Sequence, residues 1–91
     1  MNGIRRDQES KRVKSVFRDC FNLHAAKLAE LGTVDPGTFW DDFFTRMQEI
    51  EAQHPDDALT CAFLVAIHAD LEAMEQRITD HKEGDEEHNE I

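Results

Sequence analysis

The sequence predicts an all-α protein of three helices in one domain. Apolar residues recur three and four positions apart along three long stretches, which is the spacing of one helix face. Proline and glycine fall only between these stretches or near the chain ends, and no stretch alternates as a half-buried strand does. We expect helices over about residues 7–31, 38–54 and 55–83, forming a single helical domain of residues 1–83, followed by an acidic tail of residues 84–91.

The first helix is predicted over about residues 7–31. Gly32 is a natural stop after its last apolar residue. Lys11, Lys14 and Arg18 point away from the apolar stripe and should face water. The stripe expected to face the core, in which His24 also lies, contains Val13, Val16, Phe17, Cys20, Phe21, Leu28 and Leu31.

The second helix is predicted over about residues 38–54 and carries most of the aromatic side chains. It has two possible starts: Asp35 before Pro36, or Thr38 with Asp41 three residues later as a capping box. Pro55 ends it. Its apolar face contains Phe39, Trp40, Phe43, Phe44, Met47 and Ile50.

The third helix is predicted from Pro55 to about residue 83, with Gly84 as its stop. Its C-terminal half is amphipathic, with a stripe of Ile67, Leu71, Met74 and Ile78. Its N-terminal half is apolar on both flanks of that stripe, at Leu59 and Ala66 on one side and at Cys61 and Val65 on the other. The acidic segment after Gly84 lacks apolar periodicity, so we expect a solvated, disordered tail.

The net charge of -10 is distributed unevenly. Residues 1–31 carry seven basic and four acidic side chains, whereas the rest of the chain carries three basic and sixteen acidic ones. The first residues lack a secretory pattern and no apolar run approaches the roughly 18 residues of a membrane span. We therefore expect a cytoplasmic protein that does not bind membranes, in which Cys20 and Cys61 are free thiols.

No motif predicts catalysis, a cofactor or a bound metal. Glu51 and His54 have the E-x-x-H spacing of ferritin-like metal sites, but the motif occurs once. Ser10 and Ser15 are the only serines and lack the context of a nucleophile. We expect a non-enzymatic protein; a metal-binding, ferritin-like dimer is a minor alternative.

Direct nucleic-acid binding is not expected, although residues 1–18 hold six basic side chains and two acidic ones. The third helix begins with Asp56 and Asp57, where a recognition helix would meet phosphates. The acidic body has an alternative use: Asp41, Asp42, Asp56 and Asp57 could imitate phosphates toward a basic groove. That hypothesis makes the protein a decoy or inhibitor of a nucleic-acid-binding protein.

The first hypothesis is an interaction protein, a regulator or inhibitor that occupies a surface of another protein. Two other helices cannot cover the whole circumference of the apolar half of helix three, and large exposed apolar patches mark protein interfaces. We expect a homodimer, with Trp40, Phe43, Phe44, Cys61 and Val65 at the partner or dimer interface. Alternatively, the small residues Ala58, Ala62, Ala66 and Ala69 let helices approach closely within one chain.

Overall fold

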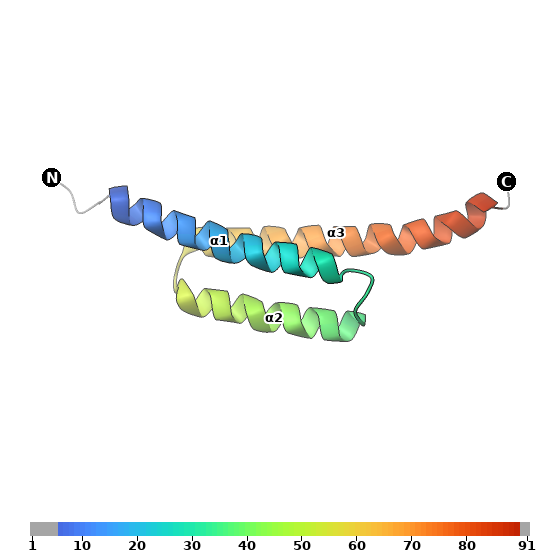
Figure 1. The fold of residues 1–91 in the computed structure, drawn as a ribbon, viewed down its shortest axis with the longest axis horizontal. Helices are drawn as coiled ribbons and strands as arrows, with labels where there is room; N and C mark the ends of the chain where they lie inside the picture. The colour runs from blue at the N-terminus through green and yellow to red at the C-terminus, as the bar shows by residue number, and fades with distance from the viewer. Residues whose placement is uncertain (1–5, 90–91) are drawn as a thin grey trace.

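The computed structural model contains three α-helices, α1 (Arg6–Glu30), α2 (Pro36–Gln53) and α3 (Ala58–Asn89), packed side by side (Figure 1). It describes the backbone of residues 6–89 and the side chains of residues 6–80. Within this part of the chain there is no strand, and the prediction of an all-α fold is confirmed. The molecule is elongated, with principal extents of 69 × 25 × 17 Å.

The helices run up, down and up, so that α1 and α3 are parallel. Three contacts show the register between α1 and α3: Arg12 pairs with Asp57 (Nη1 to Oδ1, 2.6 Å), the Phe17 and Phe63 rings touch, and His24 meets Asp70 (Nε2 to Oδ2, 2.7 Å). From the first contact to the third, the residue numbers rise in both helices, so α1 and α3 run in the same direction. α2 lies antiparallel to α1, since its C-terminal His54 reaches Asp19 while Asp42 reaches Lys27.

α1 faces the core with a different stripe from the one predicted. Its buried residues are Val16, Cys20, Leu23 and Lys27. Phe17, Phe21 and Leu28, which were expected in the core, are exposed. Val16 and Cys20 belong to both stripes; with successive residues about 100° apart, the observed stripe is the predicted one turned by roughly 65° around the helix. The predicted stripe omitted both Leu23 and Lys27.

α2 begins with the first of the two predicted signals. Asp35 is the N-cap, and its carboxylate accepts a hydrogen bond from the Thr38 backbone N–H at 3.2 Å. Pro36 follows at the first helical position, where its missing N–H costs nothing. Phe39, Phe43 and Ile50 enter the core, while Trp40 and Met47 are partly buried.

α3 begins one turn later than the prediction of Pro55. Asp56 has a φ of 56°, in the left-handed region, which is incompatible with a continuing right-handed helix. Asp57 then caps α3: its carboxylate accepts hydrogen bonds from the backbone N–H and the hydroxyl of Thr60. The buried residues of α3 are Thr60, Leu64, Ile67 and Leu71.

The C-terminal end of α3 also differs from the prediction. The helix continues through Gly84, the expected stop, to Asn89. The disordered acidic tail predicted for residues 84–91 is therefore not confirmed, and its side chains lie outside the described residues. A single glycine inside a helix costs about 1 kcal/mol relative to alanine and does not by itself end the helix.

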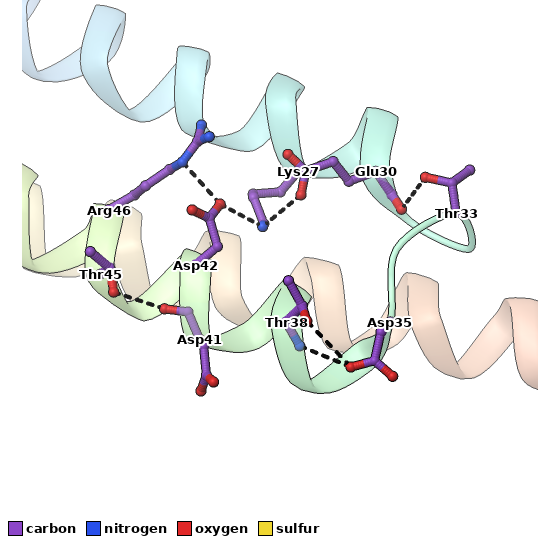
Figure 2. Close-up of polar contacts among 9 residues, drawn as sticks. All are labelled: Lys27, Glu30, Thr33, Asp35, Thr38, Asp41, Asp42, Thr45 and Arg46. Carbon is purple, nitrogen blue, oxygen red and sulfur yellow. Dashed lines mark hydrogen bonds and ion pairs between the residues drawn. The ribbon is translucent and has the colours of Figure 1, made fainter.

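A buried lysine joins α1 to α2 (Figure 2). The Lys27 side chain is 0% exposed; its Nζ lies 2.8 Å from Glu30 Oε1, 2.9 Å from Asp42 Oδ2, and 4.2 Å from the centre of the Phe39 ring. Arg46 Nε approaches the same Asp42 oxygen at 3.0 Å. The hydrogen bond from Lys27 is the main reason that the pKa of Asp42 lies below its ordinary value. Two carboxylates and one ring therefore compensate the buried ammonium group.

Candidate interaction surface

The outer side of the first half of α3 is entirely apolar. Between Ala58 and Ala69, the exposed residues are Ala58, Cys61, Ala62, Val65, Ala66 and Ala69. A helix at a protein surface ordinarily presents charged or polar side chains to water on this side. The prediction that neighbouring helices leave part of α3 uncovered agrees with this arrangement.

One flank of this surface faces α1. Leu59, Phe63, Ala66 and Asp70 follow one another at helical spacing on the α1 side of α3. The Phe63 ring meets the Phe17 ring edge to face, with centroids 4.6 Å apart. Beside this pair, a shallow groove of about 180 Å³ is lined by Phe17, Cys20, Phe21, His24, Phe63 and Ile67.

This flank has the most exposed aromatic side chains of the described residues. Phe17 is 50% and Phe21 69% exposed, and Leu28 continues the same side of α1. We call Phe17, Phe21, Leu28, Leu59, Phe63 and Ala66 the α1/α3 face. It combines a rigid aromatic cluster with a small residue on α3 that permits close approach of another helix.

The other flank of α3 faces α2, and its aromatic side chains mostly cover one another. The His68 ring stacks on Phe43 (centroids 5.7 Å apart) and meets Phe44 edge to face at 5.4 Å. The Trp40 indole N–H donates to Glu75 Oε1 at 3.4 Å. We call Trp40, Phe44, Cys61, Val65 and His68 the α2/α3 face. Only Phe44, Cys61 and Val65 of this group are classed as exposed.

The five residues predicted at the interface therefore differ in how far their side chains are exposed. Phe43 is 0% exposed and lies in the core, so the expectation that it is a surface residue is wrong. Trp40 is half-buried, whereas Phe44, Cys61 and Val65 are accessible. Sequence reasoning missed Phe17 and Phe21 because it placed them in the core stripe of α1. The i+4 and i+7 spacing of Cys20 and Leu23 from Val16 was the signal that could have moved them outward.

The four acidic residues singled out by the sequence also divide into two pairs. Asp41 and Asp56 are exposed. Asp42 and Asp57 hold the fold together instead: Asp42 pairs with Lys27 and Arg46, and Asp57 caps α3 and pairs with Arg12. The hydrogen bonds from Thr60 lower the pKa of Asp57, with Arg12 adding to the effect.

The described side chains do not assemble a metal site around the E-x-x-H motif. No three His, Cys, Asp or Glu side chains among residues 6–80 are grouped so that they could hold a metal ion. His54, the second member of the E-x-x-H motif, directs its Nε2 to Asp19 Oδ2 at 2.9 Å, and Glu51 is exposed. A larger hollow, of about 400 Å³, lies beside the turn between α1 and α2; among the described residues that line it, Glu75 alone is titratable.

In the described part of the chain, no helix has both the length and the apolar character needed to span a bilayer. Comparisons with protein-family models, with curated proteins and with solved structures found no match. The function is therefore inferred from the surfaces of the chain itself.

Proposed function

We propose that the protein is a non-enzymatic helical interaction protein. It docks on a partner through the outer side of α3 together with the α1/α3 face. The observation that carries the proposal is the absence of any polar side chain among the six exposed residues between Ala58 and Ala69. Contiguous apolar surface of this kind is uncommon on a protein that works alone and marks interaction sites.

Phe17 and Phe21 support the proposal because exposed aromatic rings cost free energy in water and contribute strongly to binding once covered. Burying an aromatic side chain contributes about 1.5–3 kcal/mol relative to leaving it exposed. Interface residues of this type supply most of the affinity in many complexes. The contact between Phe17 and Phe63 holds one ring in place before binding, which reduces the entropy lost on docking.

Site-specific photo-crosslinking tests this function. A photoreactive phenylalanine analogue replaces Phe21 in the full chain inside living cells, and matched chains carry it at the exposed positions Gln48 and Asp41. We expect a discrete covalent adduct from position 21 and none from position 48. Adducts from position 41 alone would favour the acidic decoy. Equal, diffuse labelling at all three positions would contradict docking through a defined surface.

A further inference from the structure

Three basic side chains of α1 border the α1/α3 face. Lys11, Lys14 and Arg18 are all exposed, and we call them the basic edge. Lys14 precedes Phe17 by three positions and Phe21 by seven, so it lies on the same side of the helix as the two rings. Lys11 and Arg18 lie one turn before and one turn after Lys14. Positive charge and exposed aromatic rings therefore adjoin each other along α1.

The carboxylates of α1 leave most of this charge uncompensated. Two of them lie in the first turn of the helix, before the basic edge, and the other two are Asp19 and Glu30. Glu30 is bound to the buried lysine described above. Asp19 directs one oxygen to the end of α2 and the other to Arg18 Nε, at 3.2 Å. Among the described side chains, Lys11 and Lys14 have no ion-pair partner, so both ammonium groups face water.

The register between α1 and α3 sets the basic edge beside apolar surface. Arg12 meets Asp57 and Phe17 meets Phe63, so the basic edge lies level with the first two turns of α3. The exposed side chains of these two turns are Ala58, Cys61 and Ala62. A helix lying along the groove between α1 and α3 would meet apolar residues on α3 and positive charge on the outer edge of α1.

We propose that the α1/α3 face binds an acidic amphipathic helix of a partner protein. This inference rests on the proposed function and names the chemistry of the partner. The apolar side of such a helix covers Phe17, Phe21 and the small residues of α3, and its carboxylates lie along the basic edge. The shallow groove beside the Phe17 and Phe63 rings receives one of its apolar side chains. Apolar contact supplies the affinity, and the charge pairs select the partner.

The apolar run of α3 sets the length of the contact. From Ala58 to Ala69, α3 rises about 17 Å at 1.5 Å per residue, which matches about three turns of a docked helix. The alanines of this run let that helix approach closely. Immediately beyond it, the exposed side chains of α3 include Asp70 and Glu72, which would repel an acidic helix. Contact is therefore confined to the part of α3 that lies beside the middle of α1.

Other occupants fit this surface less well. Polybasic sites for anionic membranes combine about four to eight Lys or Arg side chains, whereas the basic edge has three and the whole chain carries -10. A nucleic acid would contact the basic edge through its phosphates and leave the apolar residues of α3 uncovered. The homodimer expected from the sequence would use the same face, so the acidic helix and the second copy exclude each other.

Selection from a displayed peptide library tests the charge of the occupant. Each peptide is a helix of about three turns with a fixed apolar side, flanked by positions that hold Glu, Gln or Lys in equal proportion. We expect the natural full chain and Phe44→Glu to enrich Glu at the flanks, and Phe21→Glu to enrich nothing, because its carboxylate would be buried without a partner. Non-specific attraction to a chain of charge -10 would enrich Lys instead.

Several results of this selection would overturn the proposal. They are enrichment of Lys or Gln, enrichment of no peptide by the natural chain, and enrichment that survives Phe21→Glu but is lost in Phe44→Glu. Circular dichroism verifies that both variants are folded.

Charge reversal tests the basic edge itself. The affinity of the most enriched peptide, labelled with a dye, is measured by fluorescence anisotropy. Lys14→Glu should weaken binding by at least about threefold, because an attraction becomes a repulsion. Arg77→Glu makes the same change of charge at an exposed position beyond the apolar run and should have little effect. Equal affinities of the two variants would show that the basic edge does not select the partner.

Cosedimentation with vesicles of equal parts phosphatidylserine and phosphatidylcholine tests a lipid surface as the occupant. We expect the natural chain to remain in solution. Cosedimentation that is lost in Phe21→Glu would assign the α1/α3 face to anionic lipid and would overturn the proposal.

The proposed function and this inference fail differently. An adduct from position 21 in cells, together with selection of neutral or basic peptides, would support docking through this surface and contradict an acidic occupant. So would an adduct that has only twice the mass of the chain. No defined adduct from position 21, together with no enrichment that depends on Phe21, would contradict both.

Discussion

Lys27 shows how a basic side chain can sit in the core of a small protein. Its ammonium group contacts Glu30 and Asp42 and lies over the Phe39 ring, and these three contacts offset the cost of its burial. The same contacts connect α1 to the first turns of α2. Lys27 therefore acts both as a filler of the core and as a link between two helices.

Replacing Lys27 should destabilise the fold more than replacing a lysine at the surface. We expect Lys27→Ala to lower the free energy of unfolding by about 2–3 kcal/mol, because it leaves a cavity and removes the partner of two carboxylates. Lys11→Ala, on the exposed side of the same helix, should change it by less than about 0.5 kcal/mol. Urea unfolding followed by circular dichroism measures both. Equal effects of the two substitutions would contradict the buried position of Lys27.

Three aspartates make the stability of the fold sensitive to acid. The pKa values of Asp19, Asp42 and Asp57 lie below the ordinary value. At Asp19, burial raises the pKa, but hydrogen bonds from His54 and Arg18 together outweigh it. A carboxyl group whose pKa is lowered by folding stabilises the native state fully above its ordinary pKa. It loses that contribution as the pH falls through the lowered value.

The free energy of unfolding should therefore fall steadily from about pH 5 toward about pH 2. Asp42→Asn should lower stability at neutral pH and reduce the slope of this acid loss, because the Lys27 ammonium then faces an uncharged amide. Asp41→Asn, at the exposed neighbouring position, should leave the slope closer to that of the natural chain. Denaturant titrations at a series of pH values measure the slopes. An unchanged slope in Asp42→Asn would show that this carboxyl contributes nothing to acid sensitivity.

At the scale of helices, the residues that begin each helix could be predicted only in part. The Asp35 and Pro36 signal for the start of α2 was one of the two that the sequence offered, because a capping carboxylate and a proline act locally, but the predicted start at residue 38 was two residues late. The start of α3 was not predicted correctly. The stretch "HPDD" offers a proline and two aspartates, and only the fold decides which aspartate caps the helix. Asp57 caps α3 because its side chain also reaches Arg12 on α1, a contact between residues 45 positions apart.

This local geometry gives opposite expectations for the two neighbouring aspartates. Asp57→Ala should lower the free energy of unfolding by about 1–2 kcal/mol through loss of the helix cap and the Arg12 pair. Asp56→Gly should raise it by about 0.5 kcal/mol, because glycine adopts a φ of 56° without steric cost. Thermal and urea unfolding of the two variants measure the difference. A loss of stability in Asp56→Gly would contradict the left-handed conformation.

The packing of α1 shows why the surface was harder to predict than the helices. Periodicity located the helix, but the choice of core stripe depended on whether Lys27 or Leu28 pointed inward. A lysine counts as a surface residue in any pattern based on polarity, and its ion pairs arise only when α2 brings Asp42 to it. This partial rotation of the buried stripe moved Phe17 and Phe21 from the expected core to the surface. Conversely, Phe43 moved from the expected surface to the core.

At the scale of the whole molecule, charge asymmetry was visible in the sequence but its spatial order was not. The sequence showed a basic first helix and an acidic remainder. The parallel register of α1 and α3 separates the basic beginning of α1 from the acidic end of α3. The exposed apolar residues of α3 between Ala58 and Ala69 lie alongside the middle of α1, and they are the part of the molecule that most needs a cover.

Hydroxyl-radical footprinting of the unmodified chain tests this account most directly. The oxidation rates of Phe17, Phe21 and Phe44 are measured by mass spectrometry at a low and a high protein concentration; all three side chains are exposed in the single chain. We expect Phe17 and Phe21 to be protected at the high concentration while Phe44 continues to react at its original rate. Protection of Phe44 with Phe17 and Phe21 left reactive, or equal rates at both concentrations for all three, would contradict a homodimer, the partner expected from the sequence, that docks through the α1/α3 face.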